Sequence, residues 1–160
     1  MTPVERLRAF IADMLQWEVT LAAQRTASDE RWKEELDGDP SAVDPRVRKQ
    51  MAGEREQISQ EAREKLRSIF TEHLSVKALA TTAQSQLALM QTCSPPEYEQ
   101  KVLADTEIRR GRRIYIEAFI TVGGLAPHRR YSLVMENGGP KIDAVLWRSD
   151  SEDKWSRGYV

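Results

Sequence analysis

The chain has 160 residues, of which 40% are apolar and 31% are charged, and its formal net charge is −1. This composition excludes a disordered tail, and the length predicts a single domain over residues 1–160. The balanced charge argues against non-specific binding of nucleic acid. Cys93 is the only cysteine, which excludes an internal disulfide and a cysteine-based metal site.

The N-terminal residues favour a cytoplasmic protein. Residues 1–6 lack the apolar segment and the small-residue cleavage site of a signal peptide. Elsewhere the apolar runs are only a few residues long, whereas a membrane-spanning helix needs about 20 residues. We therefore expect a cytoplasmic location and no membrane partner.

A long helix, or two abutting helices, is predicted over residues 3–36. Thr2 suits the N-cap, Pro3 suits the first helical position, and Glu5 completes a capping box. An apolar stripe with helical spacing follows and predicts a core-facing side; its members are Phe10, Met14, Trp17 and Leu21.

A second helix is predicted over residues 45–74, after a break at residues 37–41 that contains Gly38 and Pro40. Asp44 can cap this helix, and Pro45 suits its first position. The first half is polar all round, whereas the second half regains an apolar stripe. For residues 76–90 the pattern fits either a short helix or an irregular segment.

Period-two alternation replaces helical spacing after Pro96 and predicts antiparallel strands. They are expected at residues 101–108, 114–122, 131–136, 141–147 and 154–159. Turns are predicted at residues 109–112 and at 137–140, where Asn137-Gly138 is a strong hairpin signal. Gly123 and Gly124 offer further positions at which a strand can bend.

Helices therefore dominate residues 1–90, and strands dominate residues 97–160. This segregation predicts an α+β fold in which N-terminal helices pack on one face of a curved antiparallel sheet.

Several segments together resemble a known family, the immunity proteins of bacterial polymorphic toxin systems that have a nuclear transport factor two-like fold. The resemblance covers about residues 60–156, and its elements are residues 66–73, Pro95-Pro96-Glu97-Tyr98, residues 131–134, residues 141–145 and Lys154-Trp155. It implies a cone-shaped sheet and a function in binding a cognate toxin delivered by contact-dependent or type VI secretion. Sheet faces in this fold often pair, which leaves a homodimer open.

One residue departs from the family pattern. Pro140 stands where the family hairpin commonly carries a tryptophan. Because proline cannot donate to a sheet ladder, either the turn is one residue longer or Pro140 lies at an edge.

No catalytic set, metal site or cofactor motif is predicted. His73 and His128 are the only histidines and lack metal-binding spacing. We expect His73 to contact helix-end carbonyls or solvent, and His128 to lie in an exposed loop.

Asp143, in the middle of a strand, supports an alternative function. In this alternative the chain uses a pocket in the cone, either as an isomerase-like or hydratase-like enzyme or as a small-molecule binder. Asp143 would be the general base of the enzyme, and Tyr115 or Tyr131 would supply a second polar group. The favoured interpretation is an outward-facing or hydrogen-bonded structural residue.

Two sets of residues are predicted to bind a protein partner. Seven acidic residues lie between positions 29 and 44, against two basic ones. Those predicted to dock a toxin are Glu34, Glu35, Asp37 and Asp39, because carboxylates complement the basic surface of a nuclease. The other interpretation is a solvated helix end. Trp147 and Trp155 are the second set, since tryptophan is enriched at binding hot spots.

Overall fold

The computed structural model describes residues 1–122 and 124–160, apart from the side chains at positions 36 and 40. Gly123, one of the predicted bending points, lies outside the described residues. Five α-helices and one 3₁₀ helix precede the sheet, namely α1 (Pro3–Arg31), α2 (Lys33–Asp37), η1 (Pro40–Ala42), α3 (Pro45–His73), α4 (Val76–Ala80) and α5 (Thr82–Leu89).

The helix boundaries follow the capping signals in the sequence. The Thr2 hydroxyl accepts a hydrogen bond from the Glu5 backbone N–H at 3.2 Å, and the Glu5 carboxylate accepts one from Thr2 N at 2.7 Å. Asp44 caps α3 by accepting from Arg46 N at 2.8 Å. Trp32 separates α1 from α2, so the first predicted helix is in fact two abutting helices.

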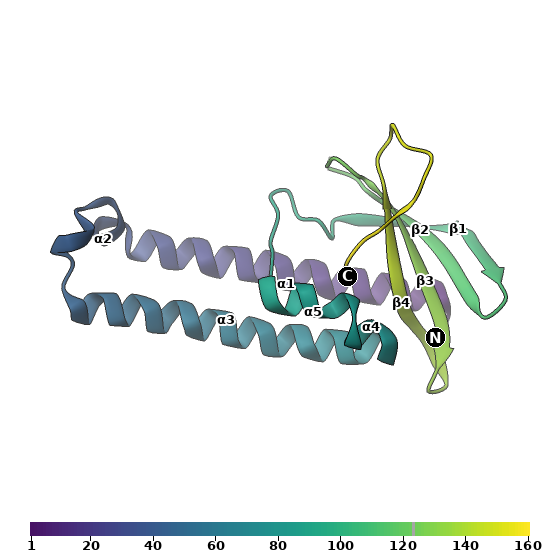
Figure 1. Cartoon of the computed structure of the whole chain (residues 1–160), viewed down its shortest axis with the longest axis horizontal. Helices are drawn as coiled ribbons and strands as arrows, with labels where there is room; N and C mark the ends of the chain where they lie inside the picture. The colour runs from purple at the N-terminus through teal and green to yellow at the C-terminus, as the bar shows by residue number, and fades with distance from the viewer. Residues whose placement is uncertain (123) are drawn as a thin grey trace.

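Helices α1 and α3 form a long antiparallel hairpin (Figure 1), with α2 and η1 at the end far from the sheet. The opposite end of the hairpin packs on the sheet, where α1 contacts β1 and β4. The central core lies there, and the predicted stripe of α1 is buried in it. Residues fully enclosed at this end include Phe10, Met14, Leu66, Phe70 and Tyr131.

The sheet is antiparallel and has the strand order β1-β2-β3-β4-β5. Its strands are β1 (Gln100–Arg110), β2 (Arg113–Ile120), β3 (His128–Glu136), β4 (Gly139–Arg148) and β5 (Ser156–Arg157). Along β2 the buried Ile114, Ile116, Ala118 and Ile120 alternate with half-buried residues, so one face meets the helices and the other faces outward. The predicted α+β fold is confirmed.

Local details explain where the strands begin and end. Asn137 (φ 51°) and Gly138 (φ 81°) make a two-residue turn between β3 and β4, which is shorter than the predicted turn at residues 137–140. Pro140 pairs with Met135 inside β4, and β5 covers only Leu146 and Trp147, so Pro140 lies at a local edge. The last strand is much shorter than predicted. The segment over residues 76–90, whose structure the sequence left open, forms α4 and α5.

Candidate partner-binding surfaces

The four acidic residues predicted to bind a partner all lie at the tip of the α1–α3 hairpin (Figure 1). Glu34, Glu35 and Asp37 belong to α2, and Asp39 is the N-cap of η1. Three of them are exposed, and Glu35 is half-buried. Glu34, Glu35 and Asp39 border a shallow cleft of about 310 Å³ together with small apolar residues. The tip therefore carries clustered carboxylates and projects away from the sheet.

Asp39 also has a structural task at the tip. Its carboxylate accepts hydrogen bonds from Ser41 N at 3.0 Å and from Ser41 Oγ at 2.8 Å. The bond from the backbone N–H lowers the pKa of Asp39, because it stabilises the ionised form. Asp39 thus holds η1 in place, whereas Glu34 and Asp37 offer their charges to solvent.

Polar contacts between the two long helices hold the base of the tip. Arg31 forms an ion pair with Glu54, and the Trp32 indole N–H donates to the same carboxylate. Next to it, Arg55 of α3 pairs with Asp29 of α1 at 3.1 Å. These contacts position the tip without any contribution from the sheet.

Trp147 and Trp155 lie at the sheet end of the molecule, so the six predicted residues do not form one surface. Trp147 packs under the C-terminal segment: its ring centroid lies 4.8 Å from that of Tyr159 and 4.4 Å from the Arg129 guanidinium. A Cβ atom on Gly158 would lie 2.1 Å from Trp147 Nε1, so only glycine permits this approach. Trp147 therefore fastens the end of the chain to β4.

Trp155 lies on the outer face of the sheet. Its half-buried ring is contacted by the guanidinium groups of Arg130 and Arg148, at 4.4 and 4.9 Å from the ring centroid. Arg130 also forms an ion pair with Glu117 at 2.6 Å. The arrangement immobilises the indole at the surface, where a partner can reach it.

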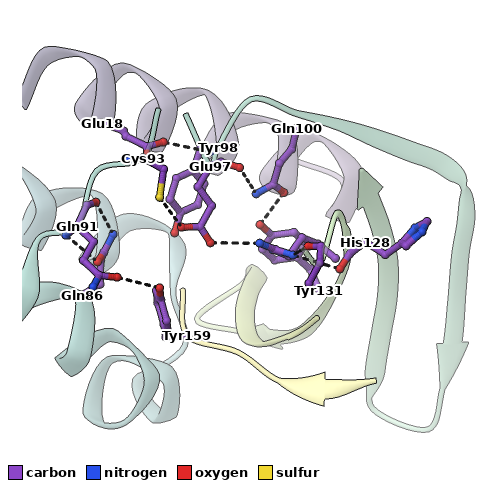
Figure 2. A network of polar contacts seen from close by, with 12 residues as sticks. Glu18, Gln86, Gln91, Cys93, Glu97, Tyr98, Gln100, His128, Tyr131 and Tyr159 are labelled. Carbon is purple, nitrogen blue, oxygen red and sulfur yellow. Dashed lines mark hydrogen bonds and ion pairs between the residues drawn. The ribbon is translucent and has the colours of Figure 1, made fainter. Parts of the chain in front are cut away.

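A buried carboxylate that sequence reasoning missed fixes the segment before β1 (Figure 2). Glu18 of α1 is 1% exposed and accepts hydrogen bonds from Cys93 N at 2.9 Å and from Tyr98 N at 3.1 Å. The signal was present in the sequence, because Glu18 follows Met14 by four residues and therefore belongs to the apolar stripe.

A buried ion pair continues this network (Figure 2). Glu97 and Arg129 approach to 3.3 Å, with side chains 13% and 6% exposed. Burial raises the pKa of Glu97, and the guanidinium of Arg129 only partly opposes this effect. Beside the pair, Tyr131 donates to Gln100 Oε1 at 2.9 Å.

The interior of the cone is occupied by aromatic side chains. Phe10 meets Tyr98 and Tyr131 edge to face, with ring centroids 6.1 and 6.3 Å apart. Burial raises the pKa of both tyrosines, which therefore remain neutral phenols. These three buried rings pack against one another between α1 and the sheet.

Asp143 serves as a link between the sheet and α4. It is the extra residue of a β-bulge, because Ser132 pairs with Ala144 and Leu133 pairs with Ile142. One carboxylate oxygen accepts from the Ser75 hydroxyl at 2.9 Å, and the other lies 3.3 Å from Arg113 and 3.6 Å from Lys77. The geometry therefore favours the structural interpretation over a general base.

The tyrosines proposed to assist Asp143 do not converge. Tyr131 is buried on the face that meets the helices, where it pairs with Ile116. Tyr115 pairs with Ser132, the next residue along β3, and so it lies on the opposite face.

The expected environments of both histidines are wrong. His73 is fully buried, with Nε2 2.8 Å from Asp13 and Nδ1 3.2 Å from Arg6. Asp13, Glu72 and His73 bring potential metal ligands within 4.8 Å of one another, but the Arg6 guanidinium lies 3.9 Å from Glu72 and supplies the positive charge there. His128 begins β3 and bonds to Asp150 at 2.6 Å.

Comparison with known proteins places this structure in a family. The model of the family described as NTF2 fold immunity protein matches residues 44–159. The chain belongs to this family. The match runs from the N-cap of α3 to the penultimate residue, so α1 and the acidic residues of the tip precede it.

Two further comparisons, with curated proteins and with solved structures, identified no relative of this member of the immunity family. Searches of curated proteins and of solved structures gave no significant match. Among its described residues, no helix combines the length and apolar character that a membrane crossing requires.

Proposed function

We propose that this chain is an immunity protein that binds a cognate bacterial toxin and neutralises it by direct contact, without turnover. The observation that carries the proposal is the family match, which covers α3 and all the strands. The filled interior and the engaged carboxylate of Asp143 support a binder over an enzyme. In this proposal the toxin is delivered by contact-dependent or type VI secretion, and the chain acts in the cytoplasm of the cell that it protects.

Growth protection tests the proposed function. Cells that express the candidate cognate toxin should stop growing, and co-expression of the chain should restore growth. The two proteins should also co-purify as a complex. An unrelated immunity protein at equal abundance is the control. Growth arrest that persists despite abundant folded chain, with no complex recovered, would contradict the proposal.

We further propose that the acidic tip docks the toxin. A toxin that attacks nucleic acid needs a basic surface, because neutralising phosphates dominates its affinity for substrate. Exposed carboxylates at the end of a projecting hairpin attract such a surface and can cover it. Charges of this kind act mainly on the association rate, and salt weakens them.

Charge reversal at the tip should slow association with the toxin. Changing Glu34, Glu35 and Asp37 to lysine is expected to lower the association rate by about tenfold or more at low ionic strength, with a smaller effect in high salt. Asp39 is kept because it caps η1. Stopped-flow mixing at two ionic strengths gives the rates. The matched control reverses three exposed acids elsewhere, at Glu56, Glu99 and Asp105. Equal rates for both variants at low salt would place the docking site away from the tip.

A further inference from the structure

A groove that the proposed function does not use lies between α3 and the pair of short helices α4 and α5. Its volume is about 610 Å³. Phe70, Leu79, Leu87 and Ala88 give it an apolar lining, while Arg63 and Arg67 bring charge from α3. Figure 1 shows the short helices beside the sheet-proximal half of α3, so this groove is separate from the acidic tip.

The walls of the groove are held in place by the chain itself. Arg63 Nε donates to the Leu87 carbonyl at 3.1 Å, and Arg25 of α1 donates to the Met90 carbonyl at 2.9 Å. Met90 is the C-cap of α5, in the left-handed conformation. Two guanidinium groups therefore fix the C-terminal end of α5 against the long helices, and the groove exists before any partner binds.

The charge of the groove is not balanced locally. Its lining contains two arginines and no carboxylate. Arg67 is exposed and forms no hydrogen bond or ion pair within the described part of the chain. Arg63 bonds to a carbonyl oxygen, which leaves its positive charge without an anionic partner among the described residues. A guanidinium presents a planar fork of donors that matches a carboxylate, and its apolar neighbours strengthen such a pair by excluding water.

We propose that this groove takes an acidic amphipathic segment of the toxin, with carboxylates on Arg63 and Arg67 and a bulky apolar side chain against Leu79 and Leu87. This inference rests on the proposed function. The tip and the groove then carry opposite charges at separate places along the molecule. A toxin with a basic surface and an acidic segment is bound in one orientation only, because reversing it would bring like charges together.

The test uses two exposed positions in the groove, Arg67→Glu and Ala88→Glu, which lie outside the core. The double variant should bind the cognate toxin at least tenfold more weakly than the wild-type chain in a calorimetric titration. Arg109→Glu, which changes the charge by the same amount as Arg67→Glu at an exposed site elsewhere, should bind within twofold of the wild type. Unchanged melting temperatures confirm folding. If the wild type binds the toxin and the double variant binds equally well, the proposed toxin contact is overturned.

A second arm separates failure of the groove from failure of the proposed function. A fluorescein-labelled peptide of alternating glutamate and leucine is titrated against the chain, with a lysine–leucine peptide as control. Tighter binding of the glutamate peptide by at least tenfold, lost in Arg67→Glu, supports the chemistry of the groove even if no toxin binds. Equal binding of the two peptides overturns it. Displacement of the glutamate peptide by short single-stranded DNA would also overturn it, by assigning the groove to nucleic acid.

Discussion

Replacing Trp17 with alanine is expected to destabilise the protein by about 3–5 kcal/mol, because it removes a large buried ring from the interface between α1 and α3. Trp17 is 5% exposed, and its indole N–H donates to the Ala62 carbonyl at 2.9 Å. Denaturant unfolding at equilibrium measures the change in free energy.

Two variants on the same helix serve as controls for Trp17→Ala. Trp17→Phe keeps a ring and removes the hydrogen bond, so it should fall between the wild type and the alanine variant. Val19→Ala truncates a side chain that is 48% exposed and should change the free energy by less than about 1 kcal/mol. A loss below about 1 kcal/mol for Trp17→Ala would mean that the ring does not belong to the core.

Replacing Arg129 with methionine is expected to cost about 3–5 kcal/mol, because the buried Glu97 carboxylate loses its cation. The same change removes the contact between the guanidinium and the Trp147 ring. Methionine keeps most of the side-chain volume, but the change also removes hydrogen bonds from the guanidinium to the carbonyl oxygens of Ala126 and His128. In the double variant with Glu97→Gln, much of the stability should return. A double variant as unstable as Arg129→Met would show that the lost contacts with Trp147 and with these carbonyl oxygens, rather than the buried charge, set the cost.

The loss of unfolding free energy caused by Arg129→Met should depend on pH. Burial already raises the pKa of Glu97 above its ordinary value of 4.5, and loss of Arg129 removes the group that opposes this rise. When the folded pKa of an acid lies above its unfolded value, folding is favoured by protonation. That contribution is complete below about pH 4.5 and is lost as the pH rises through the folded pKa. The gap between Arg129→Met and the wild type should therefore shrink on acidification. A gap that is the same at pH 5 and pH 8 would mean that Glu97 is not the source of the cost.

The elements of this fold could be predicted because their signals are local. Thr2, Pro3 and Glu5 specify a helix start by contacts within one turn, and Asn137-Gly138 specifies a hairpin by its own backbone preferences. The short final strand was overestimated, because only Ser156 and Arg157 reach partners on β4.

The candidate site was harder to predict, because its geometry depends on contacts between distant residues. Trp147 was expected at an interface, yet Gly158 and Tyr159 fold back over it. His73 was expected to contact helix-end carbonyls or solvent, yet it is buried and its Nε2 lies 2.8 Å from Asp13, 60 residues earlier. The acidic residues were recognised from their clustering, but only the pairing of α1 with α3 places them at the end of a projecting hairpin.

The tip of the hairpin lies far from the core that stabilises the fold, so the proposed recognition residues are separate from the residues that fold the chain. Each long helix has 29 residues, and at 1.5 Å per residue it spans about 43 Å. Glu34 and Asp37 thus lie far from the buried residues of the sheet, and substitutions there leave the core packing untouched. Under the proposed function, a lineage that meets a new toxin could alter this short segment at little cost to stability. The helical stalk would then let partner choice diverge while one sheet and one core are retained.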